Sequence, residues 1–205
     1  MASTISTPTT TTVPLSVINI DGDIPDIDNQ LPFLPSPLPD PHSDFIYCTP
    51  PEAPTYRPFS VFLAGSIEMG KAINWQRHMS HYLQHLPLTV LNPRRGHWDQ
   101  SAKPSPSDQT FRTQVEWELD ALNKATVICF FFDKNTLSPV TLLELGLWAK
   151  SGKVVVCCPE GYWKGGNVRL VCEREGVPCV GSFGDLVPEI VKMLGEKGME
   201  IPEAN

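Results

Sequence analysis

The stretch Ser138–Lys153, with the sequence SPVTLLELGLWAKSGK, gives the clearest indication of the fold. It lies between two very apolar runs, Thr126–Phe132 (TVICFFF) and Val154–Cys158 (VVVCC). Such runs are typical of buried strands, and the stretch between them has the length and end signals of a helix. Pro139 suits the first helical turn, and Gly152 suits a helix end in the left-handed conformation. This pattern predicts the βαβ unit of a parallel sheet.

One acid, Glu144, lies in this expected helix and is a candidate functional residue. The apolar residues that surround it at helical spacing are Val140, Leu143, Leu147 and Trp148. An acid on the apolar side of a helix, close to the carboxyl end of a parallel strand, lies where such sheets place their ligands. The alternative interpretation is structural, because acids near a helix start offset the helix dipole.

The remaining segments extend the alternation of strands and helices. Helices are expected over about 72–86, 109–123, 167–175 and 186–194. The five expected strands are 60–65, 88–91, 126–132, 154–158 and 177–180. This order predicts an α/β fold with a doubly wound, five-stranded parallel sheet, flavodoxin-like, in the strand order 2-1-3-4-5.

Residues 1–56 differ in composition from the rest of the chain. They are rich in Thr, Pro, Ser and Asp, as in TPTTTTVP and LPFLPSPLPDPHSD. Proline this dense excludes long helices and central strands. We therefore expect a disordered Pro-rich arm over 1–56, an α/β domain over 57–196 and a C-terminal tail over 197–205.

The net charge of the chain and its cysteines indicate which binding partners and which cellular compartment to expect. A net charge of −7 argues against a nucleic-acid polymer and leaves small nucleosides and nucleotides possible. We expect no membrane contact, because there is no apolar run of membrane-spanning length, and the N-terminus does not have the composition of a secretory signal. The six cysteines show no metal-type spacing, so we expect reduced core cysteines, no cofactor and a cytoplasmic protein.

Two loops carry further candidates for ligand binding. Gly65 and Ser66 follow the first expected strand, where a glycine permits a close backbone approach to a ligand or simply turns the chain. A long loop begins at Asn92 and contains Arg94 and Arg95, which could meet a phosphate. The alternative is a solvated loop whose arginines pair with surface acids.

A second acid, Glu118, lies in the expected helix over 109–123. The apolar stripe of this helix is expected to be Phe111, Val115, Leu119 and Leu122. Glu118 lies three residues after Val115 and four before Leu122, on or beside that stripe, whereas Glu116 and Asp120 fall on the solvent side. Burying a carboxylate is costly unless it is paired or protonated, so packing alone does not explain Glu118.

Four motifs in this order resemble the nucleoside 2-deoxyribosyltransferase superfamily, and most closely its deoxyribosyltransferase-like branch. They are FLAGSI (62–67), NPRR (92–95), QVEWE (114–118) and SPVTLLELG (138–146). The resemblance covers about residues 59–195. The superfamily also contains hydrolases that cleave the N-glycosidic bond of deoxynucleoside or nucleoside monophosphates.

The resemblance implies roles for single residues. Glu144, in LLELG, matches the glutamate nucleophile of the family. Glu118 matches the position where the family usually has an aspartate beside the nucleophile. Ser138 matches a position that contacts sugar or phosphate, and Gly65 and Ser66 match the loop that contacts the nucleotide.

Two more positions bear on assembly and substrate. Asn167 matches an asparagine that, in the transferases, reaches into a neighbouring subunit's site, so the resemblance implies a homodimer or larger assembly. Glu68 departs from the family pattern, because the monophosphate hydrolases carry an arginine there for the phosphate. A glutamate would repel phosphate unless Arg94 or Arg95 outweighs it.

These residues suit cleavage of an N-glycosidic bond by two carboxylates. We expect Glu144 to stay ionised near a helix N-terminus and Glu118 to carry the proton. The sequence thus favours an N-glycosyl enzyme that transfers a deoxyribosyl group or gives it to water. One alternative is a module that binds a nucleotide-like ligand without turnover, and another is an NAD glycohydrolase whose long loop over 93–108 accommodates the larger substrate.

Overall fold

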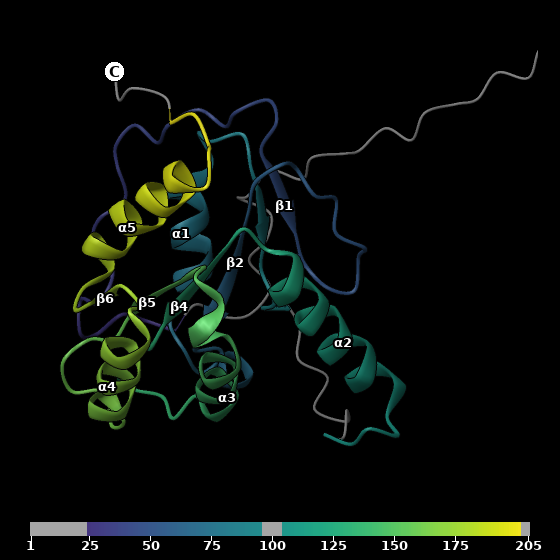
Figure 1. Ribbon diagram of the computed structural model, residues 1–205, viewed down its shortest axis with the longest axis vertical. Coiled ribbons are helices and arrows are strands. Elements are labelled where there is room, and N and C mark those ends of the chain that lie inside the picture. The colour runs from purple at the N-terminus through teal and green to yellow at the C-terminus, as the bar shows by residue number, and fades with distance from the viewer. Residues whose placement is uncertain (1–23, 96–103, 202–205) are drawn as a thin grey trace, which may run out of the picture.

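A parallel sheet of six strands forms the centre of the protein (Figure 1). The computed structural model describes residues 24–95 and 104–201. The strand order is β1-β3-β2-β4-β5-β6, and every neighbouring pair is parallel. The strands are β1 (Ile46–Cys48), β2 (Ser60–Gly65), β3 (Thr89–Leu91), β4 (Val127–Phe131), β5 (Val154–Cys157) and β6 (Cys179–Val180).

Helices cover both faces of the sheet, which is why β2, β3, β4 and β5 consist of buried residues throughout. On one face α1 and α5 pack against Val61 and Leu63, and on the other α2, α3 and α4 pack against Phe62 and Ala64. The helices are α1 (Trp75–Leu83), α2 (Gln109–Lys124), α3 (Pro139–Trp148), α4 (Gly165–Glu175) and α5 (Phe183–Glu196), with short 3-10 helices η2 (Glu68–Gly70) and η3 (Ala149–Ser151).

The predicted α/β class and the order of the five predicted strands are confirmed, but the sheet has one more strand. β1 lies at the edge of the sheet and pairs with β3, with Ile46 opposite Thr89 and Cys48 opposite Leu91. The sequence analysis missed β1 because it has only three residues and lies in a proline-rich region. An edge strand forms ladder hydrogen bonds on one side only. Prolines, which lack a backbone N–H to donate, are therefore tolerated close to it.

The prediction of a disordered arm is wrong for residues 24–56, whereas residues 1–23 lie outside the described residues. Residues 24–45, here called the N-terminal strap, contact α1 and the loop between β4 and α3. On α1, Nε2 of His78 lies 2.7 Å from the carbonyl oxygen of Pro32, and the Tyr82 hydroxyl donates to the carbonyl of Phe33 at 2.9 Å. The strap, although rich in proline, is therefore bound to the domain through its backbone carbonyl groups.

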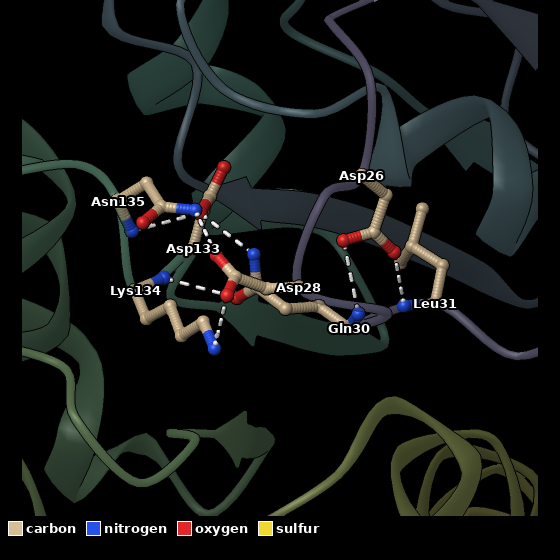
Figure 2. Close-up of polar contacts among 7 residues, drawn as sticks. All are labelled: Asp26, Asp28, Gln30, Leu31, Asp133, Lys134 and Asn135. Atoms are coloured by element: carbon tan, nitrogen blue, oxygen red, sulfur yellow. Dashed lines mark hydrogen bonds and ion pairs between the residues drawn. The ribbon is translucent and has the colours of Figure 1, made fainter.

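The strap also binds the loop after β4 through side chains. The Gln30 amide donates to Asp133 at 2.9 Å and accepts from the backbone N–H of Lys134 at 3.0 Å (Figure 2). Asp28 forms an ion pair with Lys134 at 2.8 Å and accepts from Asn135 at 2.7 Å. These two contacts lower the pKa of the Asp28 carboxyl, the hydrogen bond from Lys134 contributing most.

The buried side of α2 differs from the expected stripe. Leu119 is exposed, while Trp117, Ala121 and Leu122 are buried. The Trp117 indole donates to the carbonyl of Glu52 at 2.8 Å, so this large side chain faces inward and sets the rotation of the helix. Within the described ranges, none of the helices has the length and apolarity needed to cross a bilayer.

Candidate active site

The site lies where the chain reverses its direction across the sheet. After β2 the chain goes to β3 on one side, and after β4 it goes to β5 on the other, so β2 and β4 are neighbours whose following loops separate. A crevice at the carboxyl ends of such strands is where open α/β sheets bind ligands. The loop after β2 carries Ser66 and Glu68, and the loop after β4 carries Thr136 and Ser138.

Three buried hydroxyl groups join these two loops. The Ser66 hydroxyl oxygen lies 2.7 Å from that of Ser138 and 2.9 Å from that of Thr136, and it accepts the backbone N–H of Asp133 at 2.8 Å. Thr136 and Ser138 are 2.8 Å apart. The structure thus brings together Ser66 and Ser138, as the sequence predicted, and adds Thr136. Thr136 could have been found in the sequence, because it lies two residues before Ser138 in the loop that follows a buried strand.

Gly65 is required by a close contact inside the protein. A Cβ atom at this position would overlap the backbone oxygen of Phe131 and would lie 2.6 Å from the ring of Trp75. Both neighbours are buried. The glycine is therefore needed for packing between β2, β4 and α1, and the backbone approach to a ligand that we predicted here stays a prediction.

Glu68 holds the start of α3. Its Oε2 accepts the backbone N–H of Leu137 at 2.7 Å and that of Ser138 at 3.3 Å. Glu68, Met69 and Ser138 all have positive φ angles, of 44°, 54° and 48°, which non-glycine residues rarely adopt. The surrounding contacts hold these residues in a conformation of high local energy, as is common in binding sites.

Two glutamates from different helices interact with each other and form a second group of candidate residues. Glu118 comes from α2 and Glu144 from α3, and each is partly buried. Burial raises the pKa of Glu144 to about 8, and the charge of Glu118 adds to the rise. Burial also raises the pKa of Glu118, while the hydrogen bond from Gln114 and the charge of Arg95 act against that rise. Two mutually destabilising carboxylates of this kind are typical of catalytic sites.

The expectation that Glu144 stays ionised is wrong for the protein without ligand. α3 begins at Pro139, so Glu144 is its sixth residue, and no acid lies in the first turn. The helix dipole acts mainly within that turn and cannot offset burial here. Val140, Leu143 and Leu147, which lie around Glu144 at helical spacing, are 60%, 64% and 62% exposed, so this apolar face of α3 is turned to solvent in the single chain.

A chain of polar contacts leads from the loop after β3 to Glu118. Nε of Arg95 donates to the side-chain oxygen of Gln114, and the Gln114 amide nitrogen donates to Glu118 and, at 3.1 Å, to the carbonyl of Pro93. Gln114 was not singled out in the sequence, although it lies one helical turn before Glu118. These contacts favour the ionised form of Glu118 over that of Glu144.

Arg94 and Asn92 are held by contacts within the protein. The Arg94 guanidinium is buried and donates to the carbonyls of Ile73 at 3.0 Å and Ala72 at 3.1 Å. The Asn92 amide donates to the Tyr47 hydroxyl, and its oxygen accepts the backbone N–H of Arg94 at 2.9 Å. Arg94 thus ties the loop after β3 to the segment before α1 and is not a solvated side chain, while its contact with a phosphate stays a prediction.

Asn167 comes from a further helix, α4. It is exposed in the first turn of α4, which begins at Gly165, two residues before the helix start expected from the sequence. The structure therefore brings together Gly65, Ser66 and Ser138 at one point, and it links Arg95, Gln114, Glu118 and Glu144 at another. A role for Asn167 across a subunit boundary stays a prediction.

A parallel α/β sheet that carries two interacting carboxylates on helices of one face is an arrangement typical of proteins that bind small molecules. The family model described as nucleoside 2-deoxyribosyltransferase like matches residues 58–162, and the chain belongs to this family. The match confirms the resemblance inferred from the motifs and supports a nucleoside-processing enzyme. It includes Ser66, Glu118, Ser138 and Glu144. A search of curated proteins found no match to this chain.

Proposed function

We propose that this protein is an N-glycosyl enzyme that cleaves the bond between the base and the sugar of a nucleoside or nucleotide. The observation that carries the proposal is the interacting pair Glu118 and Glu144, whose pKa values are both raised. Such a pair supplies the nucleophile and the proton donor that glycosidic cleavage needs. The family match supports a nucleoside substrate.

In the proposed reaction, the ionised Glu144 attacks the anomeric carbon of the sugar. The bond to the base breaks, its electron pair goes to the base nitrogen, and that nitrogen takes a proton from Glu118. Water or a second base then attacks the anomeric carbon and gives a proton back to Glu118, while the ester bond to Glu144 breaks. Water gives hydrolysis, and a base gives deoxyribosyl transfer.

The reactive form of the pair carries one proton. In the free protein that proton resides mainly on Glu144, because Gln114 and Arg95 favour the ionised form of Glu118. The positive charge that develops on the sugar stabilises the ionised form of Glu144 and so shifts the proton to Glu118. The two residues therefore keep the roles that the sequence suggested, but only in the presence of substrate.

The coupled pair also bears on the two alternatives. A module that only binds a nucleotide-like ligand does not need two carboxylates whose ionisation is opposed by burial. An NAD glycohydrolase would use the same carboxylate chemistry, and half of the loop that could hold the larger substrate, residues 96–103, lies outside the described residues. A substrate panel therefore has to include NAD.

The decisive experiment combines base release with intact-mass spectrometry. The wild type, Glu144→Gln, Glu118→Gln and the control Glu116→Gln, whose side chain is 62% exposed, are mixed with deoxynucleosides, nucleosides, their monophosphates and NAD. We expect base release and a sugar adduct for the wild type and the control, and neither for Glu144→Gln. Ligand binding by all four proteins without any release would instead favour the binding module.

We also propose that the protein forms a homodimer or larger assembly through α3 and α4. Val140, Leu143 and Leu147 form an exposed apolar row on α3, and Leu170 on α4 is 66% exposed. Apolar side chains gathered in this way mark interaction surfaces, and Asn167 lies in the first turn of the same α4. Light scattering should give a multiple of the monomer mass for the wild type.

The variant Leu143→Glu should be monomeric, whereas Leu119→Glu, with the same change at an exposed position of α2, should behave like the wild type. A monomeric wild type with full activity would remove the role proposed for Asn167.

The cytoplasmic location stays a proposal. All six cysteines are free, and five of them are buried. Burial raises the pKa of the Cys129 and Cys158 thiols, the latter to about 11, which keeps them protonated and unreactive. Reduced core cysteines are typical of proteins from reducing compartments, and this supports the proposal.

A further inference from the structure

Two cysteine side chains meet where the chain turns from α4 into the edge strand β6. Cys172 lies near the end of α4, and Cys179 is the first residue of β6. The backbone N–H of Val177 donates to the carbonyl of Cys172 at 2.9 Å, so the chain turns back directly after the helix. Val177 and Cys179 pack against the same cluster of buried side chains that contains Cys172. The two thiols therefore lie against each other, and a hydrogen bond joins them.

A surface cavity gives access to one member of this pair. Its volume is about 340 Å³, and it is lined by Arg169, Glu173, Val177, Cys179, Val180 and Gly181. All six cysteines lie in the described residues, and Cys179 is the one that is only partly buried. Cys172 is 1% exposed and does not line the cavity. A small reagent that enters the cavity can therefore reach the Cys179 sulfur but not that of Cys172.

The surroundings favour the thiolate on Cys179 rather than on Cys172. The hydrogen bond with Cys172 is the main cause that lowers the pKa of Cys179; burial acts against it, and the charge of Arg169 lowers the pKa further. The same hydrogen bond is the main cause that raises the pKa of Cys172, with burial second. Arg169 is held in place because its guanidinium donates to the carbonyls of the two residues after β5, each at 3.2 Å. Glu173, the acid that lines the cavity, is exposed, so solvent screens its charge. An accessible thiolate beside an arginine is typical of reactive cysteines.

The other cysteines lack this access. Cys129 and Cys157 interact with each other on the opposite face of the sheet, but both are fully buried, and burial raises the pKa of each thiol. Cys158 is also fully buried. In a compartment that keeps core cysteines reduced, an accessible pair of thiols is typical of transient redox chemistry.

We propose that Cys179 is a site of oxidation by a small hydroperoxide and that Cys172 then closes a reversible disulfide with it. This inference goes beyond the proposed function and does not depend on it. With hydrogen peroxide, the Cys179 thiolate attacks one oxygen, the S–O bond forms, the O–O bond breaks, and the leaving hydroxide takes a proton to become water. The Cys172 sulfur then attacks the sulfur of this sulfenic acid, the S–S bond forms, the S–O bond breaks, and the hydroxide leaves as water with the Cys172 proton. Two thiols are thus oxidised, and one peroxide is reduced to two waters.

The test exposes the reduced whole chain to hydrogen peroxide, blocks the remaining thiols by alkylation and maps the tryptic peptides by mass spectrometry. Trypsin cleaves after Arg174, between the two cysteines, so their disulfide joins two separate peptides, Leu170–Arg174 and Glu175–Lys192. We expect the wild type to lose two hydrogen atoms and to give this linked pair of peptides. Treatment with a dithiol reductant should restore both thiols.

Three variants separate the roles of the two sulfurs. Cys179→Ala should be oxidised about tenfold more slowly than the wild type, because the accessible sulfur is gone. Cys172→Ala should stop at a sulfenic acid on Cys179, which dimedone traps. The control Cys48→Ala removes a thiol that is also buried and lies in the opposite edge strand β1, and it should behave like the wild type.

Each of four results would overturn the inference. In the wild type these are survival of all six thiols, a disulfide that joins other cysteines, and oxidation of Cys179 that stops before a disulfide forms. The fourth is a Cys179→Ala variant that is oxidised as fast as the wild type. The first three are measured on the wild type alone, so the inference can be refuted even where a variant does not fold.

Discussion

Replacing Glu144 with glutamine should stabilise the folded protein at alkaline pH and change its stability little at acid pH. Burial, with the charge of Glu118 as the second cause, raises the pKa of Glu144 from 4.5 to about 8. The folded protein therefore retains a proton that the unfolded chain releases. Glutamine has nearly the same shape and no charge, so the variant does not incur the cost of ionising this carboxyl.

The two pKa values, 4.5 in the unfolded chain and about 8 in the folded protein, set the size of the effect. Each pKa unit corresponds to about 1.4 kcal/mol, so ionisation lowers the free energy of unfolding by roughly 5 kcal/mol above the folded-state pKa and by about 3 kcal/mol near neutral pH. For an acid whose pKa is raised on folding, this stability is fully present below 4.5 and is lost as the pH rises to about 8. The difference between variant and wild type grows across that window.

The assay is urea unfolding, followed by tryptophan fluorescence, at a series of pH values that spans this window. Glu116→Gln is the matched control, because it makes the same chemical change at a side chain that is 62% exposed. Its unfolding free energy should stay within about 0.5 kcal/mol of the wild type at every pH, because the exposed i,i+4 ion pair with Arg112 that it loses contributes little. Glu118→Gln should move the window for Glu144 to lower pH, because it removes the second cause of the raised pKa.

A difference between Glu144→Gln and the wild type that is the same at every pH would refute the reasoning. So would a difference no larger than that of the control. Either result would mean that the Glu144 carboxyl ionises in the folded protein as it does in the unfolded chain. The argument for a proton shared by the pair would then lose its basis.

Three further predictions concern catalysis, packing and the N-terminal strap. The pH profile of kcat/KM for base release should be bell-shaped with its alkaline limb near 8, because only the pair Glu118 and Glu144 with one proton is active; a rate that keeps rising through that pH contradicts this. Gly65→Ala should lower the free energy of unfolding by about 1–3 kcal/mol in a urea titration, since the new Cβ overlaps the backbone of Phe131. Gln30→Ala removes two hydrogen bonds to the loop after β4 and should lower the unfolding free energy by about 1–2 kcal/mol, whereas an unchanged value would mean that the strap is not bound in solution.

The strands could be predicted from the sequence because their composition reflects burial on both faces of the sheet. The side chains of Val127–Phe131 and Val154–Cys157 are apolar apart from the cysteine thiols, and such runs are typical of strands that are buried on both faces. β1 could not be predicted in this way. Its three residues become a strand because β3 offers a free edge, and that edge exists only in the folded sheet.

The identity of the candidate residues could be predicted better than their ionisation. The position of Glu118 beside an apolar stripe and the position of Glu144 in the central helix both pointed to the pair. The direction of the pKa shift depends on how deeply Glu144 is buried and on its closeness to Glu118, and both are properties of the tertiary structure. The structural role of Arg94 depends likewise on carbonyl groups some twenty residues earlier in the chain.

The loop that begins α3 is supported by three segments that are distant in sequence. Glu68 binds its N–H groups, Tyr162 binds the carbonyl of Leu137, and Gln30 of the N-terminal strap binds Asp133, whose own N–H donates to Ser66. The family match covers residues 58–162 and so includes the first two supports but not the third. Through Gln30, the strap, which lies outside the matched region, contacts the loop that precedes α3 and Glu144. We therefore expect a chain shortened to the matched region to lose this support and to hold the start of α3 less firmly.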